Sequence, residues 1–189
     1  MTYKEIIASF NLSIPFDSDG FINEEELFNL YPENFVLIDR FPMIINKTME
    51  WFSPLDVFFT RKEQTVNEYF EVERKYINTL TILSCYSPLW VQSSFYFSKR
   101  LPDYLSEEER NYLIKIKDYL FIQVNTPIEL ACLLKLSLRG YEQTIIYLPE
   151  LKVIAWVNEL IVSLYYQDEK SRKLIEMITT TEGLYLRKK

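Results

Sequence analysis

The chain has 189 residues, of which 48% are hydrophobic and 16% aromatic, and its formal net charge is −6. This composition is typical of one globular domain with a sizeable core, and the acidic balance disfavours nucleic acid and anionic membranes as partners. There is no histidine, and there are three glycines where ordinary usage gives roughly thirteen. Histidine-based triads, histidine-containing zinc sites and glycine-rich phosphate loops are therefore excluded.

Four capping patterns predict where helices begin. In each, a Ser, Thr or Asn stands three residues before a glutamate. The two side chains can then accept hydrogen bonds from backbone N–H groups that have no partner at the start of a helix. The pairs are Thr2 with Glu5, Asn23 with Glu26, Ser106 with Glu109, and Thr126 with Glu129. The last two begin helices predicted over 107–122 and 127–139. The second of these carries apolar residues from Ile128 to Leu138 and ends before Gly140.

Apolar spacing predicts a further helix around 64–84. Residues 31–52 are ambiguous, because 35–38 favours a strand while Pro42 prevents a continuous helix. The uncharged stretch 76–98 is long enough to span a membrane, but its many polar residues and Pro88 favour buried structure, with 94–98 as a candidate strand. No apolar targeting segment follows Met1, so we expect a cytoplasmic protein without membrane contact.

After Gly140 the chain changes to β-branched and aromatic runs. They predict strands over 144–148, 151–157 and 160–166, joined by short polar linkers that suit antiparallel turns. Asp168 then caps a helix, and Gly183 precedes a short closing strand at 184–186.

We therefore expect an α+β fold in a single domain over 1–189. Its N-terminal two-thirds would be mainly helical, with 1–30 as a candidate helical appendage. That part would pack on the subregion 141–189, an antiparallel β-meander with a final helix and a short closing strand.

The segment 17–26 resembles the loop of a calcium-binding EF-hand. Gly20 stands at the sharp turn, and Glu26 stands where a bidentate ligand belongs. The first ligand position falls on Pro15, which has no side-chain oxygen, so one ligand and one charge are missing. We expect no metal site and no cofactor, and interpret 17–20 as a turn before the helix that Asn23 caps. Weak calcium binding by the loop remains an alternative.

Two acidic runs occupy predicted first helical turns. Two explanations fit glutamates at these positions. Their negative charge stabilises the helix N-terminus, or their carboxylates contact a basic partner. On the second explanation the candidate partner-binding residues are Glu24, Glu25, Glu26, Glu107, Glu108 and Glu109. No motif marks a nucleophile or a catalytic carboxylate pair, so no catalytic residue is assigned.

Both cysteines, Cys85 and Cys132, lie in apolar surroundings and are expected to be reduced and buried. The three tryptophans, Trp51, Trp90 and Trp156, are expected to pack in the core, because no basic residues alternate with the aromatic ones.

The C-terminal third carries a run IIYLPELKVI at 145–154, then LYY at 164–166, a charged helix, and EGLYL at 182–186. This succession resembles the tail of small bacterial immunity proteins, which neutralise toxins of polymorphic and contact-dependent inhibition systems. The resemblance implies a non-catalytic, acidic, cytoplasmic protein that binds one cognate toxin. The composition agrees, because acidic residues steer a basic partner and tyrosines anchor interfaces.

We therefore expect a stoichiometric inhibitor of a basic, nuclease-type toxin. A phage accessory factor or a scaffold subunit of a larger complex is the main alternative. A carboxylate-based enzyme and a degenerate calcium-binding module are weaker ones.

Overall fold

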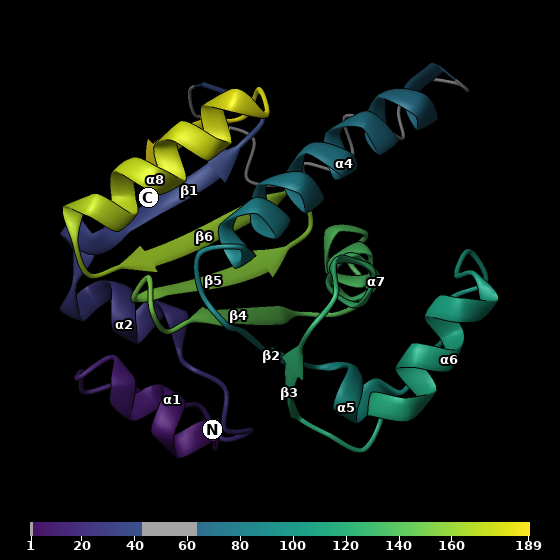
Figure 1. Ribbon diagram of the computed structural model, residues 1–189, viewed down its shortest axis with the longest axis horizontal. Coiled ribbons are helices and arrows are strands. Elements are labelled where there is room, and N and C mark those ends of the chain that lie inside the picture. Colours follow the sequence, from purple (N-terminus) through teal and green to yellow (C-terminus); the bar gives the residue numbers. More distant parts are fainter. Residues whose placement is uncertain (1, 43–63) are drawn as a thin grey trace.

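A computed structural model describes residues 2–42 and 64–189 of the chain. Within these residues, seven strands form one antiparallel sheet with helices on both faces (Figure 1). Across the sheet the order is β3-β2-β4-β5-β6-β1-β7. The strands are β1 (Phe35–Asp39), β2 (Leu89–Ser93), β3 (Phe121–Val124), β4 (Thr144–Leu148), β5 (Val153–Asn158), β6 (Ile161–Tyr166) and β7 (Tyr185–Lys188).

The helices divide between the two faces of the sheet. One face is covered by α4 (Gln64–Ser84), α7 (Pro127–Leu138) and α8 (Glu169–Thr181). The opposite face is covered by α1 (Tyr3–Ser9) and α2 (Glu24–Leu30), which precedes the 3₁₀ turn η1 (Pro32–Asn34). The short α5 (Phe95–Ser98) follows β2, and α6 (Glu107–Ile116) packs beside α7.

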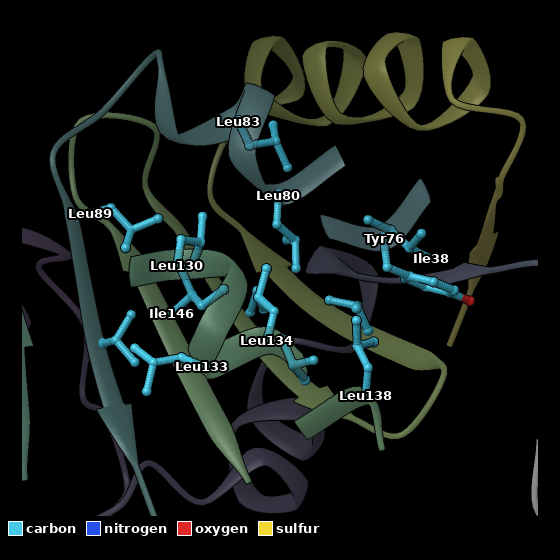
Figure 2. Close-up of a cluster of buried hydrophobic side chains, with 14 of the residues drawn as sticks. Ile38, Tyr76, Leu80, Leu83, Leu89, Leu130, Leu133, Leu134, Leu138 and Ile146 are labelled. Atoms are coloured by element: carbon cyan, nitrogen blue, oxygen red, sulfur yellow. The ribbon is translucent and has the colours of Figure 1, made fainter. Parts of the chain in front are cut away.

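Side-chain alternation along the strands divides the core between these faces. Ile146 and Val153 point toward α4 and α7, whereas Ile145 and Trp156 point toward α1 and α2. In Figure 2, leucines of α4 and α7 meet over the sheet. Because helices cover both faces, the central strands are buried on both sides and read as continuous apolar runs.

The predicted β-meander is confirmed. Strands β4, β5 and β6 pair in succession, and the turn between β5 and β6 closes on the pair Asn158 and Ile161. The final helix begins at its predicted cap, since the Asp168 side chain accepts a hydrogen bond from the Ser171 amide. The closing strand β7 pairs with β1 and not with the meander.

The predicted helical N-terminal two-thirds is wrong. Three of the seven strands, β1, β2 and β3, lie in it, and helices alternate with them. The local pattern left 35–38 as a possible strand, and β1 confirms it. Strands β2 and β3 are only five and four residues long and pair with segments distant in sequence, so local periodicity does not reveal them.

Two boundaries differ from the predictions for the same reason. The helix predicted over 107–122 ends at Ile116, and β3 takes up its last residues. The candidate strand 94–98 is the helix α5, whereas the preceding residues 89–93 form β2. The ambiguous segment 31–52 contains β1. Its part beyond residue 42, with Trp51, lies outside the described residues.

Three of the predicted capping boxes are confirmed, at Thr2, Ser106 and Thr126. At the fourth, the Asn23 side chain accepts from the Glu26 amide, but the backbone N–H of Asn23 donates to the Pro15 carbonyl. The Glu26 carboxylate instead accepts from the Asn23 side-chain amide, 3.1 Å away.

Residues 2–30, the candidate appendage, form the layer over the second face of the sheet. Ile6, Phe10 and Leu27 are fully buried there, in one cluster with Tyr147 and Trp156.

The uncharged stretch 76–98 is divided among α4, β2 and α5. In the described part of the chain, no helix has the length and apolar character needed to cross a membrane.

Candidate functional site

A groove of about 850 Å³ lies between α6 and α7. Both helices contribute their N-terminal turns, including the N-cap residues Ser106 and Thr126. Its apolar lining comes from Tyr112, Ile128 and the buried Cys132. The volume lies within the range of ligand-binding clefts, so the groove is large enough to receive one or two side chains of a partner.

The groove is acidic. Four glutamates and one lysine line it: Glu107, Glu108, Glu109, Glu129 and Lys115. Glu107 and Glu108 are exposed, and neither forms an ion pair with any residue the structure describes. The Glu129 carboxylate accepts hydrogen bonds from the amides of Asn125 and Thr126, at 2.9 and 3.1 Å. Two of the four carboxylates, those of Glu107 and Glu108, therefore have no bonded cation among the described residues.

Glu109 has a different role from its two neighbours. It is buried, its carboxylate accepts from Lys135 Nζ at 2.6 Å, and it closes the capping box with Ser106. Burial alone would raise the pKa of Glu109, but the bonds from Lys135 and Ser106 outweigh it and hold the pKa below its ordinary value. Glu109 therefore joins α6 to α7 and sets the spacing of the groove walls.

The second acidic run lies elsewhere, at the start of α2 on the opposite face of the sheet (Figure 1). Glu24 is paired with Lys189, whose Nζ also lies 5.2 Å from the ring centroids of Phe28 and Phe35. Since Glu26 binds its own cap, Glu25 is the one carboxylate of this run without a bond among the described side chains. The two predicted runs thus belong to separate surfaces.

The loop that resembles an EF-hand is a closed turn. Asp17 Oδ1 accepts from the amides of Asp19 and Phe21, at 3.0 and 2.8 Å, and Gly20 adopts φ +81°. A bridge between Phe16 and Ile22 completes a small hairpin. Across residues 2–42 and 64–189, no three or more Cys, Asp or Glu side chains gather as a metal ion requires.

Both cysteines are free thiols, but only one is buried as predicted. Burial, aided by the nearby charge of Glu109, raises the pKa of Cys132 to about 12, so this thiol in the groove lining is protonated and unreactive. Cys85, at the end of α4, is exposed, which corrects the prediction for it.

Sequence reasoning missed the apolar part of the groove. Ile128 was counted among the apolar residues of the helix predicted over 127–139, yet 57% of its surface is exposed. The helical phase gives no signal for this exposure, because Cys132 and Leu136 lie on the same side of the helix as Ile128 and are both buried. Glu129 was interpreted only as a cap. No sequence signal pointed to Tyr112, because the partner helix was unknown.

Taken together, these elements define a three-layer α/β/α protein with an antiparallel sheet and an acidic groove between two helices of one layer. Comparisons with protein-family models, with curated proteins and with solved structures found no match to this chain.

Proposed function

We propose that this protein binds a basic protein partner stoichiometrically and without catalysis, as an immunity-type inhibitor of a bacterial toxin. The observation that carries the proposal is the α6–α7 groove, where Glu107 and Glu108 are exposed and unpaired among the described residues beside the exposed Ile128. An acidic and apolar lining suits an inserted lysine or arginine, whose alkyl stem packs on apolar atoms while its charged head meets carboxylates.

The charge of the whole chain supports the same class of partner. A net charge of −6 attracts a basic protein over several ångströms and raises its association rate, an effect that salt screens. Contacts inside the groove would then decide how slowly the complex dissociates.

The experiment is affinity capture from the native lysate at moderate salt, with mass spectrometry of what is retained. The wild-type chain is compared with the double variant Glu107→Lys/Glu108→Lys. The matched control is Glu25→Lys/Glu150→Lys, which makes the same charge change at two exposed glutamates outside the groove that, like Glu107 and Glu108, form no ion pair among the described residues. We expect one basic protein in a one-to-one ratio with the wild-type and control chains, and its loss with the groove variant.

A captured protein must then be toxic when expressed alone and harmless when co-expressed with this chain. Loss of toxin neutralisation in the groove variant, with retention in the control, completes the support. Several structural proteins in place of one basic partner would favour a scaffold subunit, and unchanged capture by the groove variant would remove the groove from the proposal.

A further inference from the structure

Strand β3 forms one edge of the sheet (Figure 1), and the ladder shows which of its main-chain groups face outward. The Ser93 amide of β2 donates to the Leu120 carbonyl at 3.4 Å, whereas the Ser94 amide donates to Gln143 on the side of β4. Main-chain directions alternate along a strand. Ile122 and Val124 therefore bond to β2, and the N–H and C=O groups of Phe121 and Gln123 point away from the sheet.

These outward groups have no hydrogen-bond partner in the part of the chain that the structure describes. Two of the usual protections are missing from this four-residue edge strand. Natural edge strands carry charges or proline that prevent pairing with another chain. The other edge, β7, has Arg187 and Lys188, but residues 119–126 contain neither charge nor proline.

Exposed apolar side chains stand at both ends of β3. Tyr119 is 64% exposed just before the strand, and Ile128, in the first turn of α7, is 57% exposed four residues after it. Phe121 is half-buried and stacks on Trp90, with ring centroids 5.2 Å apart. The edge thus combines unused hydrogen-bonding groups with an apolar border.

We propose that β3 pairs antiparallel with β3 of a second copy of this chain, which joins two sheets into one. The outward-facing groups determine the register. Phe121 lies opposite Gln123 of the second copy, Gln123 lies opposite its Phe121, and the two Ile122 residues face each other across the two-fold axis. Two such hydrogen-bonded pairs supply about four intermolecular hydrogen bonds.

A second copy fits this edge for two reasons. Each copy carries a net charge of −6, which opposes association, but pairing along the uncharged residues 119–126 places no like charges of that segment side by side. Antiparallel pairing also brings the exposed Tyr119 of each copy toward the end of the strand where Ile128 of the other is exposed, as a self-complementary interface requires. This dimer does not depend on Glu107, Glu108 or a toxin, and it is tested on the pure protein. It does share Ile128 with the proposed α6–α7 groove, because Tyr119 of the second copy comes toward that residue.

Sedimentation equilibrium of the pure protein is the first test, at physiological salt and up to roughly 100 µM, because so small an interface belongs to the weak class. We expect a species of twice 22.8 kDa. Gln123→Pro removes one outward N–H without breaking a bond to β2, so the variant should stay folded and become monomeric. Gln123→Thr keeps the N–H and should remain dimeric.

A cross-link tests the register without relying on the proline variant. In a Cys85→Ser background, Ile122→Cys places two thiols across a non-hydrogen-bonded pair, where Cα atoms are about 4.5 Å apart, and mild oxidation should give a disulfide dimer. Tyr185→Cys on the exposed β7 edge is the control and should not cross-link. A wild-type monomer over the whole concentration range, or equal cross-linking at both edges, would overturn the proposal.

Discussion

Gln92 of β2 donates a hydrogen bond from Nε2 to the carbonyl oxygen of Gly20, 2.9 Å away. The same side chain accepts at Oε1 from the Tyr147 hydroxyl, at 2.7 Å. Gln92 is 1% exposed, so this contact fastens the hairpin at residues 16–22 to the middle of the sheet in a nearly dry environment. The layer of α1 and α2 is held to the sheet by polar bonds as well as by apolar packing.

Replacing the Gln92 side chain should lower the stability of the fold. Gln92→Leu leaves the Gly20 carbonyl and the buried Tyr147 hydroxyl with fewer partners, and we expect a loss of about 2–3 kcal/mol in the free energy of unfolding. Urea denaturation provides the measurement. Adding Tyr147→Phe to this variant removes one of the unsatisfied groups, so the double variant should be less destabilised than the sum of the single ones.

Breaking the buried ion pair between Glu73 and Arg139 should lower the free energy of unfolding more than Gln92→Leu does. The guanidinium donates to both carboxylate oxygens, at 2.6 and 2.8 Å, and Glu73 is 4% exposed. Glu73→Ala leaves an uncompensated cation inside the protein and should cost about 3–5 kcal/mol. The exposed pair of Glu169 and Arg172 is the comparison, where Glu169→Ala should cost at most about 1 kcal/mol. Equal losses in the two unfolding curves would contradict this assignment.

Glu109 makes stability depend on pH. Its folded-state pKa lies below the ordinary value of 4.5, so the folded state favours the carboxylate. The resulting stability is present above the unfolded pKa and is lost as pH falls through the folded one. Thermal unfolding of the wild type and Glu109→Gln should differ clearly at pH 7 and converge in acid. Glu107→Gln removes a carboxylate that is exposed and has no ion pair among the described residues, so at pH 7 it should lose less stability than Glu109→Gln.

The two thiols should react at different rates. Cys85 is exposed, whereas Cys132 is 1% exposed and its pKa is raised to about 12 by burial. A maleimide should label one equivalent of thiol per chain in the native protein and the second only after denaturation. Cys85→Ser should abolish the native labelling. Rapid labelling of both thiols would mean that the α6–α7 groove opens in solution.

Much of the local structure was predictable from the sequence. The caps at Thr2, Ser106 and Thr126 were identified correctly, because a capping box involves residues only three positions apart. The meander was also predictable, since its strands are joined by short turns and follow each other in the chain. The acidic runs were located as well, but not the groove that one of them borders, because Glu109 reaches Lys135 on another helix.

The sequence by itself determined the helix starts, the meander, the absence of histidine chemistry and the acidic balance, because caps, turns and composition act within a few residues or over the whole chain. Only the tertiary structure decided that β1, β2 and β3 join the meander in one sheet, that 2–30 forms a layer, and that Glu107 and Ile128 border one groove. These features depend on hydrogen bonds and packing between segments far apart in the chain. Their free energy appears only when those segments meet, so no local pattern records them.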